Sequence, residues 1–361
     1  MCVWIVSQLS VIQMSSKVSG TSDTDGPPSG ISPSGEFIRG ISTCREWIGP
    51  DSIHIAETDR YHLYVGINCP WCHRVILARA VLGLQSSITM DVCFPSRTDE
   101  PDDKGRVGLW QFAPNGITCR NNRHTTFPEC TSDTVFGKST IVEIYDDLGI
   151  EQKSVPILLD KKTRTIVSNE SADIVRMLSE NARALGSSLS TVPDLYPTAL
   201  QKTIDESNEW IYHTINNGAY KAGFTGSQDA YEDAYEKYFS SLDRLNVLFA
   251  TQQFVAGDVV TEADIRLFPT LFRHDPVYYS RFKLSRAKLF EYPHIWRWMG
   301  TMIASVPGVQ ECATKSILQH CKQGYFGRTG SNTIPVGPEG YPECITDGTD
   351  MTQSKRPRID T

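Results

Sequence analysis

The strongest constraint on the fold is a change of pattern halfway along the chain. Before about residue 181, runs of alternating apolar residues are separated by short helical runs. After about residue 194 the apolar spacing stays helical until about Cys321. Alternation with a period of two is typical of strands, and recurrence every three or four residues is typical of helices. We therefore expect an α/β domain followed by an all-α domain.

The first of these domains has a predicted order of elements that narrows the fold further. Strands are expected at 61–67, 88–94, 155–160 and 165–167. Helices are expected at 70–83, around 140–148 and at 170–180. The order strand, helix, strand, helix, strand, strand, helix is that of a thioredoxin-like fold with an insertion before its second helix.

The limits of the expected domains follow from these patterns. A thioredoxin-like domain is predicted at 37–180 and an all-helical C-terminal domain at 195–325. The segment 1–36 is predicted to be a flexible N-terminal arm, because its second half is rich in Ser, Gly, Pro and Asp. The segment 326–361 is predicted to be an extended tail that lies on the surface or stays mobile.

Composition excludes several classes of protein. The chain has 361 residues, a net charge of −7 and 40% hydrophobic residues, which favours a soluble globular protein over a nucleic-acid binder. The short basic run at 355–358 is interpreted as part of a solvated tail. No stretch approaches the roughly 18 apolar residues of a membrane span. The start lacks the features of a targeting segment, so a cytoplasmic location is expected, with most of the ten cysteines as free thiols.

Cys69 is the candidate nucleophile. It lies where the first strand ends and the first helix begins, in the run NCPWCHR, and Pro70 is the residue type favoured at the first helical position. The free N–H groups and the positive dipole end of a helix start favour a thiolate, which is nucleophilic at neutral pH. His73 and Arg74 are expected to add positive charge in the same turn.

The other cysteines leave one question open. As part of Cys-Pro-Trp-Cys, Cys72 either cycles with Cys69 between dithiol and disulfide or fills the first turn of the helix. Cys119, His124 and Cys130 are close in sequence, but their spacing matches no common zinc pattern. No metal is therefore expected.

Two further segments complete a candidate binding site. Val155-Pro156 precedes the third strand, where the proline would present backbone groups beside the thiol if its peptide bond were cis. Glu170 and Ser171 stand at the start of another helix, where backbone amides and the Ser171 hydroxyl suit a carboxylate and Glu170 suits an ammonium group. Combined with Cys69, these features describe a glutathione site.

At this point the chain resembles the glutathionyl-hydroquinone reductases, the Xi class of glutathione transferases. The resemblance runs from about Glu46 to Pro338. It is carried by the blocks RYHLYVGINCPWCHR, VPILLDKKTRTIVSNESADIVRML, LYPTALQKTIDESNEWIYHTINNGAYKAGF, FVAGDVVTEADIRLFPTLFRHDPVYY, GYFG and IPVGP. It implies the glutathione transferase fold, glutathione as co-substrate and a homodimer.

The resemblance also implies roles for individual residues. Cys69 would be the catalytic nucleophile, and Tyr220 and Tyr325 would lie near the aromatic substrate. The residues implied to contact glutathione are Trp110, Val155, Glu170 and Ser171. The chain departs from the family in three places: Cys72 replaces the usual alanine, GYFG replaces an HYYG-like motif, and Lys153-Ser154 replaces an arginine.

The expected mechanism is a two-step thiol exchange. Cys69 would take glutathione from a glutathionylated hydroquinone, and a second glutathione would release it as oxidised glutathione. Cys72 is then expected to have a minor role, because glutathione resolves the mixed disulfide by itself. The alternatives are an omega-like thioltransferase or dehydroascorbate reductase, a conjugating transferase, and a non-catalytic module that binds ligands or proteins.

Overall fold

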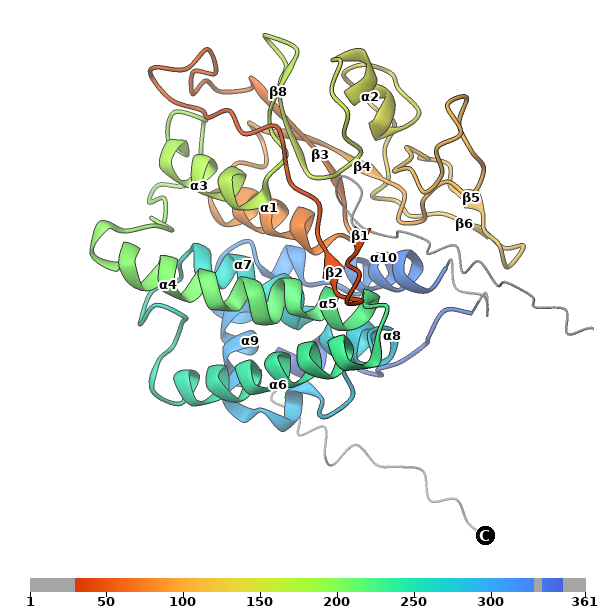
Figure 1. Cartoon of the computed structure of the whole chain (residues 1–361). Coiled ribbons are helices and arrows are strands. Elements are labelled where there is room, and N and C mark those ends of the chain that lie inside the picture. Colours follow the sequence, from red (N-terminus) through yellow and green to blue (C-terminus); the bar gives the residue numbers. More distant parts are fainter. Residues whose placement is uncertain (1–29, 328–332, 347–361) are drawn as a thin grey trace, which may run out of the picture.

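The N-terminal domain is built on a four-stranded mixed sheet, seen in the upper part of Figure 1. The computed structural model describes residues 30–327 and 333–346. The strands are β3 (Tyr61–Gly66), β4 (Thr89–Cys93), β7 (Ile157–Asp160) and β8 (Thr165–Ser168), in the order β4-β3-β7-β8. β3 is parallel to β4, and the other neighbours are antiparallel. The predicted thioredoxin-like order is confirmed.

Three helices belong to this domain, and two of them lie side by side below the sheet (Figure 1). They are α1 (Pro70–Val81), α2 (Ile141–Asp147) and α3 (Ser171–Asn181). α1 is buried almost throughout because it packs against α3 on one side and the C-terminal domain on the other. The insertion between β4 and α2 carries a small hairpin, β5 (Ile117–Thr118) and β6 (His124–Thr125).

The C-terminal domain is helical, as predicted. Its helices are α4 (Gln201–Ile211), α5 (Asn217–Phe224), α6 (Gln228–Thr251), α7 (Glu262–Phe272), α8 (Tyr279–Arg281), α9 (Pro293–Ser305) and α10 (Lys315–Phe326). α7 begins at a capping box formed by Thr261 and Asp264, because the Asp264 carboxylate accepts the Thr261 backbone N–H at 3.0 Å. α7 lies against α1 and joins the two domains.

The described parts of both terminal segments, 30–36 and 333–346, make contacts that the sequence did not predict. Within the expected arm of residues 1–36, β1 (Gly30–Ile31) pairs with β2 (Phe37–Ile38), and this hairpin contacts α5. The part of the arm at 1–29 lies outside the described residues. This segment is fixed on the C-terminal domain by the pairing of the two strands and by the Gly226 N–H, which donates to the Gly35 carbonyl oxygen.

The described part of the C-terminal tail also packs on the domain. The Tyr341 side chain is buried, and its hydroxyl donates to the Phe272 carbonyl oxygen at 3.1 Å. α11 (Glu343–Thr346) follows and contacts α9. The basic run at 355–358 lies outside the described residues. Among the helices that are described, none is both long and apolar enough to cross a bilayer.

Candidate functional site

The Cys69 thiol lies at the junction of β3 and α1. Cys69 is the residue before the first turn of α1, and its backbone N–H donates to the Gly66 carbonyl oxygen at 2.9 Å. Its Sγ lies 3.9 Å from the carbonyl oxygen of Val155, which precedes a cis peptide bond to Pro156. The Cys69 side chain is fully buried in this arrangement. Val155 therefore lies between the Cys69 thiol and a solvent-accessible cavity.

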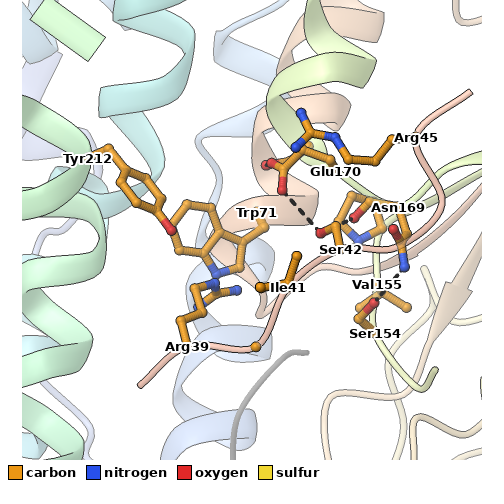
Figure 2. A pocket seen from close by; sticks show the side chains of 13 residues that line it. Arg39, Ile41, Ser42, Arg45, Trp71, Ser154, Val155, Asn169, Glu170 and Tyr212 are labelled. Atoms are coloured by element: carbon orange, nitrogen blue, oxygen red, sulfur yellow. Dashed lines mark hydrogen bonds between the residues drawn. The ribbon is translucent and has the colours of Figure 1, made fainter. Parts of the chain in front are cut away.

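This cavity has a volume of about 210 Å³ and lies on the side of Val155 (Figure 2). Four of the five predicted glutathione contacts line it: Val155, Pro156, Glu170 and Ser171. Its other lining residues are Arg39, Gly40, Ile41, Ser42, Arg45, Trp71, Ser154, Asn169 and Tyr212. The segment at 39–45 thus forms one wall. Sequence reasoning missed this role, because the segment shows no periodic pattern that would indicate what it packs against.

Glu170 is fixed at the start of α3 by three donors. Its carboxylate accepts the Ala172 N–H at 3.1 Å, the Ser171 hydroxyl at 3.4 Å and the Ser42 hydroxyl at 3.1 Å. Figure 2 shows the Ser42 contact across the cavity. Since the carboxylate is already held, a ligand's ammonium group would meet a preformed anion at this point.

Trp71 forms the opposite wall, between two guanidinium groups. Arg39 lies 4.1 Å from the centre of the Trp71 ring and Arg74 lies 4.5 Å from it. The indole N–H is buried and has no acceptor among the residues that the structure describes. Burial lowers the pKa of Arg74, although the group stays cationic at neutral pH. The cavity therefore combines one anion with several cations, which matches a ligand with two carboxylates and one ammonium group.

The predicted tyrosines meet on the C-terminal side of Trp71. The hydroxyls of Tyr220 and Tyr325 are 2.5 Å apart, and the Tyr220 ring lies 6.2 Å from the Trp71 ring. A third phenol, Tyr278, packs edge to face on both rings, and burial raises its pKa. Sequence reasoning missed Tyr278, because only the packing of three helical segments brings its ring to the other two. We call Tyr220, Tyr278 and Tyr325 the phenol cluster.

Arg273, at the end of α7, connects the phenol cluster to the nucleophile. Its guanidinium is fully buried and donates to the carbonyl oxygens of Ile67 at 2.8 Å and Asn68 at 3.2 Å. These are the two residues before Cys69. Burial acts to lower the pKa of Arg273, but the nearby Cys321 thiol and then the phenols of the cluster outweigh it, so the pKa lies above its ordinary value. Sequence reasoning missed this residue, because its partners are some 200 positions away.

The expected charge on His73 is wrong. Arg273 donates to His73 Nδ1 at 2.8 Å, so this nitrogen is the acceptor, and Nε2 donates to the Cys312 carbonyl oxygen at 2.8 Å. Burial, together with the Arg273 charge, lowers the pKa of His73 well below its ordinary value. The ring is therefore neutral, and the positive charge near Cys69 comes from Arg273 instead.

Trp110 does not lie with the other predicted glutathione contacts. It is buried against β3, where a side chain added at Gly66 would meet its ring at 2.4 Å, and the Arg97 guanidinium covers it at 3.4 Å. It is not among the residues that line the cavity. Within the described residues no group of three His, Cys, Asp or Glu side chains is arranged to hold a metal ion.

Comparisons with known proteins identify the family of this chain. The family models of the glutathione S-transferase N-terminal and C-terminal domains match residues 68–181 and 228–301. The glutathionyl-hydroquinone reductase YqjG of Escherichia coli is 38% identical over 314 residues, which are 84% of this chain and 88% of that protein. PcpF of Sphingobium chlorophenolicum, also a glutathionyl-hydroquinone reductase, is 33% identical over 311 residues, 84% of this chain and 90% of its own.

Solved structures give the same result. Glutathione-bound YqjG has a TM-score of 0.71 at 37% identity and covers 82% of this chain and 92% of its own. The Xi glutathione transferase of Phanerochaete chrysosporium has a TM-score of 0.73 at 34% identity and covers 86% and 95%. With this fold, this cavity beside Cys69 and these relatives along most of its length, the chain belongs to the glutathionyl-hydroquinone reductase family of glutathione transferases.

Proposed function

We propose that this protein removes glutathione from glutathionylated hydroquinones, with Cys69 as the nucleophile. One observation carries the proposal: the Cys69 sulfur lies against Val155, whose other side lines a cavity that contains Glu170 and Ser171. A thiol exchange enzyme needs this arrangement, because the sulfur of the bound tripeptide must come within reach of the attacking sulfur.

The cavity residues would bind glutathione as follows. Glu170 pairs with the ammonium group of the γ-glutamyl end, and the Ser171 hydroxyl and the α3 amides bind the neighbouring carboxylate. The guanidinium of Arg39, held on Trp71, binds the carboxylate of the glycyl end. The Val155 backbone pairs with the cysteinyl residue. Trp110 acts from behind the sheet, where it fixes Gly66 in place.

In the first step the Cys69 thiolate attacks the sulfur of the conjugate. A sulfur–sulfur bond forms, the bond from sulfur to the ring carbon breaks, and the ring keeps the electron pair and takes up a proton. Tyr220 and Tyr325 donate hydrogen bonds to the ring oxygens and stabilise the charge that develops there. In the second step another glutathione thiolate attacks the mixed disulfide, which releases Cys69 and oxidised glutathione.

Access to Cys69 requires a local movement. The Cys69 side chain has no exposed surface, and Phe37 and Arg39 of the N-terminal segment lie over the Tyr220 ring beside it. We infer that this segment shifts when the conjugate binds. A segment held by short strand pairing can move at a lower cost than a core helix.

We also propose that the protein is a homodimer in the reducing environment of the cytoplasm. Nine described cysteines are free thiols, which suits such a compartment. Light scattering coupled to size-exclusion chromatography tests the dimer, and a monomer at all concentrations would refute it.

The chemistry is tested with a glutathionyl-hydroquinone and intact-mass measurement. We expect hydroquinone release by the wild type and by Cys312→Ala, which removes another buried thiol beside α1. We expect none by Cys69→Ser, because a serine hydroxyl does not form the mixed disulfide. Full turnover by Cys69→Ser would refute the mechanism. Slower turnover of the aromatic conjugate than of dehydroascorbate would favour the omega-like alternative.

A further inference from the structure

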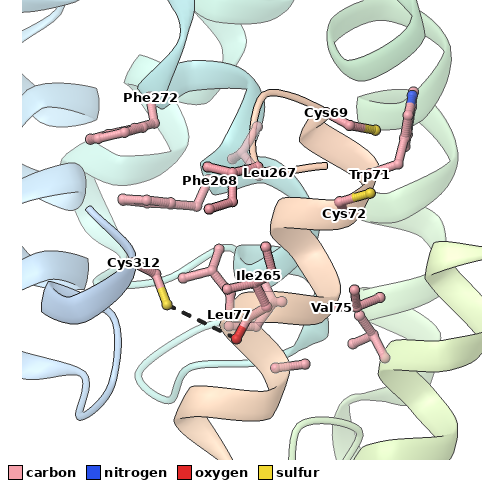
Figure 3. Close-up of a cluster of buried hydrophobic side chains, with 14 of the residues drawn as sticks. Cys69, Trp71, Cys72, Val75, Leu77, Ile265, Leu267, Phe268, Phe272 and Cys312 are labelled. Atoms are coloured by element: carbon pink, nitrogen blue, oxygen red, sulfur yellow. Dashed lines mark hydrogen bonds between the residues drawn. The ribbon is translucent and has the colours of Figure 1, made fainter. Parts of the chain in front are cut away.

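A second thiol lies within the same turn as the nucleophile. Cys72 is the third residue of α1, and Figure 3 shows the Cys69 and Cys72 sulfur atoms directed to the same side of the helix. Both residues are hydrogen-bonded to Gly66: its carbonyl oxygen accepts from the Cys69 N–H at 2.9 Å, and its N–H donates to Cys72 Sγ at 3.3 Å. The two cysteines are not joined by a disulfide in this structure.

The surroundings of the two sulfurs differ, and this difference decides which of them meets the substrate first. Both side chains are fully buried, but the Cys69 sulfur contacts Val155 at the edge of the cavity, whereas the Cys72 sulfur contacts the backbone of β3. A bulky disulfide in the cavity would therefore meet Cys69 first. Cys72 is placed to react with the Cys69 sulfur once glutathione is attached to it.

The contact from Gly66 also favours reaction at Cys72. An N–H group that donates to a sulfur favours its thiolate, in opposition to the full burial of Cys72, which disfavours ionisation. The start of α1 adds its positive dipole end, since Cys72 lies within the first turn. Apolar packing alone would have left this sulfur without either contribution.

We propose that Cys72 is a resolving thiol, which displaces glutathione from Cys69 and gives this site a dithiol–disulfide exchange activity. The inference rests on the proposed function, because that function supplies the mixed disulfide. Cys72 loses its proton, its sulfur attacks Cys69 Sγ, and the bond between Cys69 and glutathione breaks. Glutathione leaves as a thiolate and takes up a proton, while an internal disulfide forms between Cys69 and Cys72.

Two molecules of glutathione then restore the dithiol. The first opens the internal disulfide and forms a new mixed disulfide at Cys69, and the second leaves with it as oxidised glutathione. At high glutathione this route gives the same products as direct attack, so Cys72 is not required for turnover. At low glutathione it releases the active site from a persistent adduct, and it extends the substrate class to small disulfides.

The test is a single turnover without free glutathione. Reduced wild type, Cys72→Ala and Cys312→Ala are each mixed with one equivalent of glutathionyl-hydroquinone, quenched in acid and analysed by intact mass and peptide mapping. We expect the wild type and Cys312→Ala to lose two hydrogens, to carry a disulfide between Cys69 and Cys72, and to release one glutathione. We expect Cys72→Ala to keep one glutathionyl group on Cys69.

The outcomes separate this inference from the proposed function. A stable glutathionyl group on the wild type, equal to that on Cys72→Ala, overturns the resolving role and leaves the proposed function intact. Absence of hydroquinone release in every variant overturns both. If Cys72→Ala does not fold, as judged by circular dichroism, Cys72→Ser replaces it and carries the same expectation.

Discussion

The two sides of the candidate site are built by different rules. On the glutathione side, Glu170 and Ser171 take their positions from the start of one helix, where they contact each other and Ala172, although Ser42 and Arg74 also reach them. On the aromatic side, Tyr220, Tyr278 and Tyr325 come from three helical segments that are distant in sequence, and their rings contact one another. The comparison teaches that the first side is a local motif for binding, whereas the second depends on the whole C-terminal domain.

Apart from loss of the nucleophile itself, the largest effect is expected at Arg273, where the two sides meet. Arg273→Met removes the donors to Ile67 and Asn68 and the charge beside the phenol cluster. Because the loop before Cys69 loses its fixed geometry, we expect kcat to fall by more than about 10²-fold with aromatic and non-aromatic glutathionyl substrates alike. Steady-state kinetics with both substrates measures this.

The control for Arg273 is Arg176→Met. Arg176 also joins the domains, through Glu262 at 3.1 Å, but it touches neither the cavity nor the phenol cluster. We expect this variant to keep its kcat. If Arg273→Met does not fold, it is replaced by Arg273→Lys, which keeps the charge but loses the paired N–H donors of the guanidinium. Wild-type kinetics in Arg273→Lys would contradict the positioning role.

The next effect separates the two sides. Tyr325→Phe or Tyr220→Phe is expected to lower kcat by about 10²-fold with a glutathionyl-hydroquinone, because a hydrogen-bond donor to the ring oxygen is lost. With the mixed disulfide of glutathione and mercaptoethanol, which has no ring, kcat should stay near the wild type. The double variant should lose less than the product of the single losses, since the two hydroxyls share one hydrogen bond. Equal losses on both substrates would contradict the assignment.

A smaller effect is expected on the glutathione side. Glu170→Gln keeps an acceptor for the α3 amide but loses the charge, so we expect KM to rise about tenfold for both substrates, about 1.4 kcal/mol, with kcat unchanged. Glu143→Gln is the matched control, because Glu143 also accepts hydrogen bonds at a helix start, from Ser139 and Thr140, away from the cavity. A change in kcat alone would show that Glu170 acts in the chemical step.

The smallest effect on turnover is expected at Asp264, which belongs to neither side. Burial raises the pKa of its carboxyl from 3.8 to about 6. Between about pH 4 and pH 6 the carboxyl is protonated in the folded state and ionised in the unfolded state. The contribution of this group to the free energy of unfolding therefore falls by about 3 kcal/mol as the pH rises through this range. Asp264→Asn should remove that pH dependence in denaturant titrations while kcat at neutral pH stays unchanged. If the free energy of unfolding of Asp264→Asn changed with pH as it does in the wild type, this prediction would be contradicted.

The difference between the two sides also explains what the sequence predicted. The strand at β3 and the helix start at Pro70 were predicted, because each depends on residues within one or two turns. The grouping of Val155 with Glu170 followed from the order of strands. These features need only local rules and the known geometry of such a sheet.

The remaining features were not predictable, because they depend on partners far away in sequence. His73 is neutral only because Arg273, 200 positions later, donates to it. Arg39 faces the cavity because its segment pairs as a hairpin on α5 and lies over Trp71. Trp110 was expected at the ligand and lies against Gly66 instead, since a tryptophan in an insertion carries no signal of the face on which it packs.

The fit between Gly324 and Asn68 has a consequence for how such proteins can be divided. A side chain at Gly324 would meet the Asn68 amide at 2.3 Å, so α10 closes directly on the residue before the nucleophile. The thioredoxin-like half, expressed alone, would lack both this lid and the Arg273 fork. The carbonyl groups of Ile67 and Asn68 would then lack their donor and face water. Domains of related chains can therefore be exchanged only when the C-terminal domain keeps a glycine and an arginine at the positions of Gly324 and Arg273.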